Sequence, residues 1–453
     1  MKQDKIHDAL NLLDDELVEP VNALRTKGRG KRKNLRWVGL AACICAAVVA
    51  VFVPLMHGMP HAVAAENLME GIEANPVAGV ESLDEDAAAV TDFAVRLFQN
   101  SMTVGENTLV SPLSVLCALA MTANGAEGET LAQMEKTLGL DVDVLNRWLY
   151  TYMSSLPQEE WGKLSLANSI WFKQDEKFEV EQDFLQTNAD YYGAGLYGAP
   201  FDDRTLKDIN GWVEDHTDGM IPEILNELDP DAVMVLVNAL AFDAEWQNIY
   251  TENQVREKIF TTENGEERKV ELMHCSEYAY LEDELATGFI KYYEGRNYAF
   301  VALLPNEGVS VADYAASLTG EGLREMLLSV SQEKVITALP KFETETSLEL
   351  NEALETMGMT KAFDDVLAEF YGIGNYGGES LYISKVQHKT FITVDGKGTK
   401  AGAATAVNME PTSSAPPKED PKEVILNRPF LYMLIDCYTN TPFFIGSMMD
   451  PTV

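Results

Sequence analysis

Basic residues are scarce in this chain of 453 residues, in which 34 lysines and arginines stand against 72 aspartates and glutamates. The formal net charge at pH 7 is therefore −38. A protein that binds nucleic acid needs a basic surface to neutralise phosphate groups, so this composition argues against a nucleic-acid partner. The excess of negative charge favours solubility, and it does not by itself indicate a binding partner.

Cysteine and histidine are also few, and neither forms a recognisable pattern. The six histidines are scattered, and the cysteines have no paired spacing. The cysteines are Cys43, Cys45, Cys117, Cys275 and Cys437. We therefore expect buried or free thiols and no disulfide framework, zinc site or other metal site.

Catalytic signatures are missing from the sequence. We find no G-x-S-x-G elbow, no Walker A loop, no G-x-G-x-x-G and no H-E-x-x-H. The members of a Ser-His-Asp triad need only be close in space, so the sequence alone leaves such a triad open. We expect that the protein is not an enzyme and that it needs no cofactor.

One long apolar run is present, from Trp37 to Met56, and its twenty residues carry no charge. As a helix it would span a bilayer core of about 30 Å. A basic cluster at 25–36 precedes it and acidic residues follow it, which places the N-terminus inside and the rest of the chain outside. We predict a cytoplasmic tail (1–36), a single-pass membrane anchor (37–56) and a domain outside the cell.

A cleaved signal peptide is the alternative, because Ala62-Val63-Ala64 is similar to a small-residue cleavage site. Cleavage near Ala64 would make the protein secreted. The basic region and the apolar run are both long for a signal peptide, so we favour the anchor. Leu40-Ala41-Ala42-Cys43 matches a lipoprotein cleavage box only by chance, since it lies at the start of the apolar run.

Residues 57–83 have the mixed, proline-interrupted composition of a linker. Ser82 and Glu85 have the spacing of a capping box, and the helical pattern of Ala87–Phe98 follows. We therefore predict one large mixed domain over 84–453.

Several segments of this domain have clear local signatures. Ser111-Pro112 is typical of a helix N-terminus, with the serine as cap and the proline in the first position. Residues 166–172 and 233–242 have the composition of buried strands, the second with a single amide, Asn238. A buried amide without partners costs about 1–3 kcal/mol, so Asn238 must be hydrogen-bonded.

The most unusual stretch is Gly398–Val407, ten residues without a bulky side chain, which follows the β-rich Thr390–Val394. Composition alone would favour a flexible linker. Such a segment can become a strand only if another part of the chain supplies the sheet. About two dozen mostly polar residues separate it from Asn427-Arg428-Pro429-Phe430.

Taken in order, these motifs over 84–453 resemble the serpins, the serine-protease-inhibitor family. The resemblance implies an α+β fold with three β-sheets, about eight or nine helices and an exposed reactive-centre loop, in a monomer. It implies an inhibitor that traps serine proteases as a covalent acyl complex, because the cleaved loop inserts into the main sheet. The alternative is a non-inhibitory serpin that acts as a surface binding protein.

The resemblance also assigns roles to residues. Ser111, Ser114, Asn238 and His388 would form a buried network where the main sheet opens, and Trp246 would lie in the breach, where the loop enters. Each of the four network residues also has a plainer interpretation: Ser111 as a helix cap, Ser114 as a helix surface residue, Asn238 as a satisfied strand amide and His388 as a core histidine. The hinge of the loop would comprise Gly396, Gly398, Thr399, Lys400, Ala401, Gly402, Ala403 and Ala404. Serpins usually carry Glu where this chain has Gly396, and commonly again at Lys400, which keeps the non-inhibitory alternative open.

Strand alternation supports insertion independently of the family. If Thr399 points inward, then Ala401, Ala403, Thr405 and Val407 do so too. Every inward side chain is then small or β-branched. The one charge, on the next residue, stays in water.

The reactive bond follows from the usual hinge-to-scissile distance of inhibitory serpins, which ends at Thr412, with Ser413 after it. A small, uncharged Thr412 indicates elastase-like or subtilisin-like targets and disfavours trypsin-like enzymes. The segment after this bond is several residues longer than usual in serpins. The extra length could expose Met409 or Lys418 as an alternative cleavage site.

Overall fold

The computed structural model describes residues 63–157, 162–174, 178–376, 381–399 and 421–453. The predicted tail and membrane anchor lie outside this part of the chain. Within the described ranges, no helix combines the length and the apolar character needed to cross a membrane.

Nine α-helices lie within the described residues, together with three short 3-10 helices. The α-helices are α4 (Ala87–Ser101), α5 (Pro112–Ala123), α6 (Gly128–Leu138), α7 (Val142–Ser155), α8 (Gln182–Tyr192), α9 (Asp203–His216), α10 (Val311–Ser317), α11 (Gly320–Leu328) and α12 (Asn351–Thr356). The 3-10 helices are η1 (Glu252–Gln254), η2 (Glu294–Arg296) and η3 (Lys361–Phe363).

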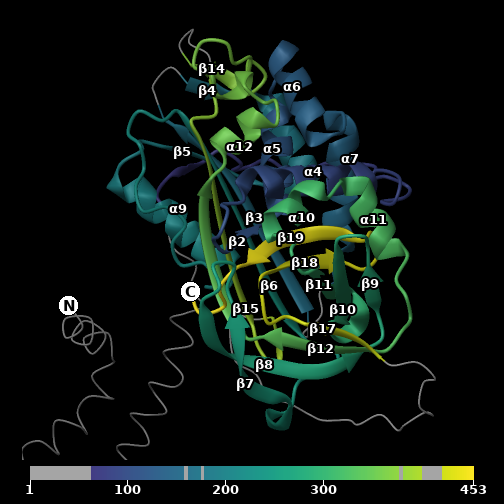
Figure 1. The fold of residues 1–453 in the computed structure, drawn as a ribbon. Helices are drawn as coiled ribbons and strands as arrows, with labels where there is room; N and C mark the ends of the chain where they lie inside the picture. The colour runs from purple at the N-terminus through teal and green to yellow at the C-terminus, as the bar shows by residue number, and fades with distance from the viewer. Residues whose placement is uncertain (1–62, 158–161, 175–177, 377–380, 400–420) are drawn as a thin grey trace, which may run out of the picture. The chain divides into compact units, whose positions relative to one another are not determined.

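The main sheet has seven strands and runs through the middle of the domain (Figure 1). Its order is β1 (Glu66–Asn67), β5 (Gly195–Ala199), β3 (Gly162–Lys173), β6 (Met234–Glu245), β16 (Gly398–Thr399), β15 (Lys385–Val394) and β13 (Phe342–Glu349). The two-residue strand β16 lies between β6 and β15, at one end of both.

The described residues also form two further large sheets and one small sheet. The six-stranded sheet has the order β2 (Thr108–Val110), β19 (Thr441–Met448), β18 (Phe430–Asp436), β11 (Tyr298–Pro305), β10 (Ala286–Tyr292) and β9 (Tyr280–Glu282). The four-stranded sheet has the order β17 (Lys422–Ile425), β12 (Val335–Pro340), β8 (Glu267–Glu277) and β7 (Val255–Thr261), and a two-stranded sheet pairs β14 (Gly374–Tyr376) with β4 (Phe178–Val180). The predicted α+β class with three main sheets is confirmed, and the small sheet at the opposite end from β7 and β8 is an addition (Figure 1).

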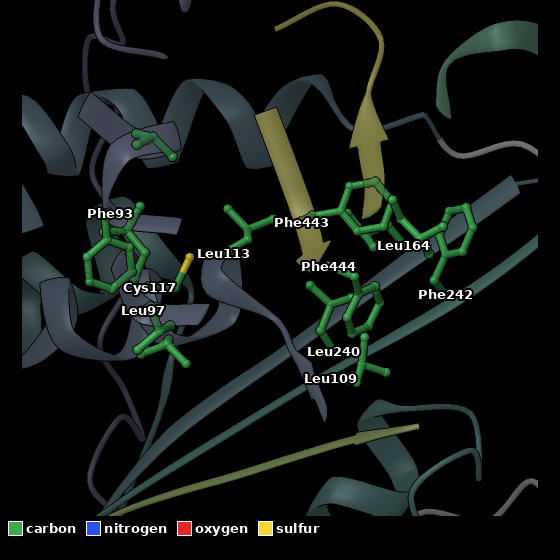
Figure 2. Packing of buried hydrophobic residues seen from close by; sticks show 14 of the residues in the cluster. Phe93, Leu97, Leu109, Leu113, Cys117, Leu164, Leu240, Phe242, Phe443 and Phe444 are labelled. Carbon is green, nitrogen blue, oxygen red and sulfur yellow. The ribbon is translucent and has the colours of Figure 1, made fainter. Parts of the chain in front are cut away.

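Strand β6 is apolar on both faces because both faces are covered. Leu240 and Phe242 belong to the large core shared with α4 and α5, and Val235 and Val237 pack in a second cluster with residues of α9. A strand covered on both sides has no polar alternation, which explains the continuous apolar run in the sequence. Figure 2 shows the large core, where side chains from α4 and α5 meet those of β3, β6 and β19.

The first helix confirms one prediction and corrects another. The predicted helix over Ala87–Phe98 is α4, but its N-cap is Asp86, whose side chain caps nothing. Ser82 instead accepts a hydrogen bond from the backbone N–H of Asp84, at 3.3 Å, in a turn ahead of the helix. The capping-box prediction was wrong because a Ser-x-x-Glu pattern caps a helix only when the helix starts directly after the serine.

The segment 63–83, predicted as part of a linker, packs on the domain. Strand β1 pairs with β5 at the edge of the main sheet, and Asp208 accepts hydrogen bonds from the N–H groups of Ala64 and Ala65, at 2.9 and 3.0 Å. Further along, the Val80 N–H donates to Thr151 Oγ1 at 2.9 Å. Residues 63–83 are therefore part of the folded unit, which extends to the N-terminal side of residue 84.

Candidate functional site: the loop hinge and the seam of the main sheet

Strand β16 is the return strand of a tight hairpin that begins at β15. Asp395 forms the turn, since its carboxylate accepts hydrogen bonds from the N–H groups of Lys397 (2.7 Å) and Gly398 (3.1 Å). Gly398 and Thr399 then pair antiparallel with Glu245 and Ala244 of β6, and Thr399 also pairs with Val394 of β15. Gly398 and Thr399 therefore already occupy the first two positions of a strand between β6 and β15.

Of the two hinge glycines that the structure describes, one position requires glycine and the other does not. A Cβ added to Gly398 would lie 2.0 Å from the backbone oxygen of Ala244, which no side chain can tolerate. A Cβ added to Gly396 would lie 3.6 Å from Tyr250, an ordinary contact. The close approach of β16 to β6 therefore depends on Gly398.

Thr399 is the first inward-facing residue of the hinge. Its side chain is 1% exposed, and its hydroxyl is hydrogen-bonded to the hydroxyl of Tyr293. Burial raises the pKa of Tyr293 well above its ordinary value, so the phenol stays neutral. The alternation predicted from the sequence therefore starts from a residue that does point into the protein.

Aromatic residues hold the hinge by its backbone. The Trp246 N–H donates to the oxygen of Lys397 (2.7 Å), and the indole Nε1 donates to the oxygen of Asp395 (2.8 Å). The N–H of Tyr250 donates to the oxygen of Gly396 at 2.7 Å. Three successive hinge carbonyls are therefore bound by two residues that follow β6.

Trp246, predicted to lie in the breach, contacts the hinge and stacks on Tyr293 with ring centroids 4.4 Å apart. The sequence did not predict Tyr250 as a hinge-binding residue. Its contact is made by a backbone N–H, which no side-chain pattern reveals.

Below the hinge, β6 and β15 pair directly with each other. Their ladder is parallel and runs from the pair Lys385 and Val235 to the pair Thr390 and Leu240. We call this ladder the seam. A longer strand in the place of β16 could form only if the seam parted.

The predicted network lies on this seam. Asn238 and His388 are partners in its ladder, and His388 Nδ1 lies 2.6 Å from Asn238 Oδ1. The Ser111 N–H donates to His388 Nε2 at 2.9 Å, so the ring proton is on Nδ1 and is donated to the amide oxygen. Ser114 Oγ lies 3.1 Å from the same oxygen, and all four residues are fully buried.

The network is uncharged and joins the seam to a helix. Burial lowers the pKa of His388 to about 3, so the imidazole is neutral at physiological pH. Ser111 is the N-cap of α5 and accepts a hydrogen bond from the Ser114 N–H, with Pro112 in the first helical position, as the sequence predicted. The plainer interpretation of the serine as a cap and its place in the network therefore hold together.

Other predicted site residues lie outside the described part of the chain. They are Lys400, Ala401, Gly402, Ala403 and Ala404 of the hinge, and the predicted reactive bond between Thr412 and Ser413. Of the cysteines, Cys117, Cys275 and Cys437 are free thiols. In the described ranges, no group of three or more His, Cys, Asp or Glu side chains is placed to hold a metal ion.

Comparison with known proteins gives one consistent family. A family model described as serpin (serine protease inhibitor) matches residues 88–451. An uncharacterized serpin-like protein of Thermococcus kodakarensis is 33% identical over 372 residues, which cover 80% of this chain and 85% of that protein. The leukocyte elastase inhibitor of Bos taurus is 30% identical over 391 residues, which cover 82% of this chain and 100% of that protein.

A solved structure agrees. The crystal structure of tengpin, a thermophilic serpin, in its native state matches with a TM-score of 0.81 and 48% sequence identity, covering 85% of this chain and 99% of tengpin. The residues that the family model matches include the hinge and the seam. The chain therefore belongs to the serpin family of serine protease inhibitors.

Proposed function

We propose that this serpin is an inhibitor that traps serine proteases as covalent acyl complexes by inserting its cleaved loop between β6 and β15. The observation that carries the proposal is β16, because Gly398 and Thr399 already pair with both neighbouring strands. A loop cut beyond them would continue the strand that they begin, once the seam between β6 and β15 parts.

The register of β16 says where each later residue would go. Continued one residue at a time, it sets Ala401 opposite Phe242 and Met409 opposite Met234, the first residue of β6. The inserted strand would then match the 12 residues of β6, or about 40 Å at ~3.3 Å per residue. Pro411, which cannot continue a central ladder, falls just beyond this length.

The same register brings Thr405 between Asn238 and His388. Insertion would break the direct hydrogen bond between these two side chains. A threonine hydroxyl both accepts and donates, so it can accept from His388 Nδ1–H and donate to Asn238 Oδ1. The Thr405 hydroxyl would thus replace the hydrogen bond between His388 and Asn238 that insertion breaks.

The target class is proposed from the residue before the reactive bond. Thr412 suits the shallow pocket of an elastase-like or subtilisin-like protease and would leave the buried carboxylate of a trypsin-like pocket unpaired. The name of one relative, leukocyte elastase inhibitor, supports the same class.

We also propose that the domain acts outside a cell membrane, held by residues 37–56. The charge-free run and the basic cluster before it support this location. Secretion after cleavage near Ala64 is the alternative. N-terminal sequencing of the mature protein separates them, since a start after residue 64 would refute the anchor.

The test of inhibition is incubation with a panel of serine proteases, followed by a search for an adduct stable in SDS. We expect an adduct with an elastase-like or subtilisin-like enzyme. Thr399→Arg is the matched variant, because a guanidinium cannot enter the buried site beside Tyr293 without a large desolvation cost. A folded Thr399→Arg protein should be cut as a substrate and form no adduct.

Two outcomes would contradict the proposal. If Thr399→Arg traps protease at the wild-type stoichiometry, insertion is not the mechanism. If the wild type forms no adduct with any protease in the panel, the chain is a non-inhibitory serpin, the alternative that Gly396 and Lys400 keep open.

A further inference from the structure

The residues that bind the hinge rest on a buried ion pair. Lys291, on β10, is 1% exposed, and its Nζ lies 2.8 Å from Oε1 of Glu277, at the end of β8. The ammonium group also donates to the backbone oxygen of Asn248 at 3.1 Å. Burying such a pair costs more desolvation than leaving it at the surface, so its burial is not explained by stability alone.

Lys291 faces the two residues that hold the hinge. Its Nζ lies 4.4 Å from the ring centroid of Tyr250 and 5.3 Å from that of Trp246, both within the range of a cation–π interaction. The backbone N–H groups of the same two residues bind the oxygens of Gly396 and Lys397. One buried cation therefore contacts both residues that set the position of the hinge.

The neighbours of the ion pair close the site around it. Cys275 Sγ lies 3.2 Å from Glu277 Oε1 and 3.4 Å from the hydroxyl of Tyr250. Burial raises the pKa of the Cys275 thiol, so it acts here as a neutral neighbour. The carboxylate thus orients both the lysine and, through the thiol, the Tyr250 ring.

We propose that Lys291 is a positioning residue for loop insertion. Paired with Glu277, it fixes Trp246 and Tyr250 so that Gly398 and Thr399 are in register with β6 before a protease arrives. This inference rests on the proposed inhibitory function, in which insertion competes with hydrolysis of the acyl-enzyme. A hinge that is already in register with β6 can begin insertion as soon as the loop is cleaved. A larger fraction of the cleaved loops then inserts before the acyl-enzyme is hydrolysed, and traps the enzyme.

The test requires removal of both charges, because Lys291→Met alone would leave Glu277 buried without its partner. The double variant Lys291→Met/Glu277→Gln keeps side chains of similar size. Its control is Lys341→Met/Glu271→Gln, which removes an ion pair of similar length (3.0 Å) whose side chains are 34% and 61% exposed. Thermal unfolding should stay close to that of the wild type for both.

The first measurement is hydrogen exchange of the intact protein, without protease, in peptides that contain Trp246 and Tyr250. We expect exchange roughly ten-fold faster in the Lys291→Met/Glu277→Gln protein and unchanged in the control. Tyr250→Leu removes the ring that the Lys291 ammonium contacts and should reproduce the faster exchange. Unchanged exchange in the double variant would overturn the assignment.

The second measurement is the stoichiometry of inhibition with a protease that the wild type traps. We expect it to rise several-fold in the double variant and to stay at the wild-type value in the control. Faster exchange with an unchanged stoichiometry would overturn the role in insertion. If the wild type traps no protease, the proposed function fails, while faster exchange in the double variant would still support Lys291 as the residue that positions the hinge.

Discussion

Replacing Gly398 by alanine adds one methyl group at the closest contact between the hinge and the main sheet. The new Cβ would lie 2.0 Å from the backbone oxygen of Ala244 and 2.9 Å from Cα of Glu245. Ordinary contact requires about 3.4 Å or more, and the obstacle is backbone in the middle of a sheet. Because β6 is held by β3 on its other side, it is β16 that must move.

The magnitude follows from what β16 would lose. Leaving the sheet removes about two backbone hydrogen bonds, worth about 1 kcal/mol each, together with the buried contact of Thr399. If the same contacts form in the transition state of insertion, a loss of about 2–3 kcal/mol corresponds to insertion roughly 30- to 150-fold slower. Gly398→Ala should therefore fold and be cut by the target protease, but act mainly as a substrate.

The assay is the stoichiometry of inhibition, with Gly396→Ala as the matched control. At Gly396 an added Cβ meets Tyr250 at 3.6 Å, and the backbone is outside the left-handed region, so alanine fits. The control should inhibit as the wild type does and gain about 0.4–1 kcal/mol of stability from a less flexible unfolded chain. Wild-type trapping by Gly398→Ala, or equal damage from both variants, would refute the reasoning.

Four further predictions concern the seam and the reactive bond. Asn238→Ala removes the acceptor shared by His388 and Ser114 and should cause polymerisation or spontaneous loss of activity on warming, seen by native gel electrophoresis; a variant that stays monomeric and inhibitory would contradict this. His388 has a folded pKa of about 3 against 6.5 when unfolded, so its contribution is complete above pH 6.5 and is lost as the pH falls from there toward 3. Between pH 7 and 4.5 the wild type should lose about 2–3 kcal/mol more unfolding free energy than His388→Gln, measured by urea titration, and equal losses would show that the imidazole does not titrate in this way. Loop-cleaved protein should unfold at a much higher temperature than intact protein, and equal melting temperatures would indicate the non-inhibitory alternative. Sequencing of the small fragment released from an adduct should begin at Ser413; a start at Glu419 with trapping by trypsin would overturn both the bond and the target class.

Local rules predicted those parts of the site in which a side chain acts on its own neighbours. Ser111 caps α5 because a hydroxyl followed by proline suits a helix start, and that pattern is contained in two adjacent residues. Asn238 had to find partners because it is the one amide in an apolar strand, and it lies against His388 and Ser114. His388 and Ser114 are far from Asn238 in the sequence, so only the family resemblance identified them as its partners.

The rest depended on contacts that leave little local signal. Strand β1 has two residues, too few for any periodicity, and it is held by pairing with β5 and by Asp208. The ion pair of Lys291 and Glu277 was also missed, although the apolar setting of Lys291 is visible in the sequence. A lysine inside such a strand needs a buried acceptor, and this rule would have marked it.

Insertion has two steps, the start of the strand at the hinge and the parting of the seam, and they involve different residues. Variants at the hinge and variants at the seam should therefore have different effects. At the hinge, strand β16 is already formed, so no barrier remains for Gly398 and Thr399 to enter the sheet. Below it, the seam is closed by direct pairing of β6 with β15 and by the hydrogen bond from His388 to Asn238. The barrier that keeps the loop out of the sheet before cleavage therefore lies at the seam. A variant that disturbs the hinge changes the register in which the inserted strand begins, and it turns the inhibitor into a substrate. A variant that weakens the seam instead lowers the barrier to insertion. The loop can then insert without any protease, into the sheet of its own molecule or of another.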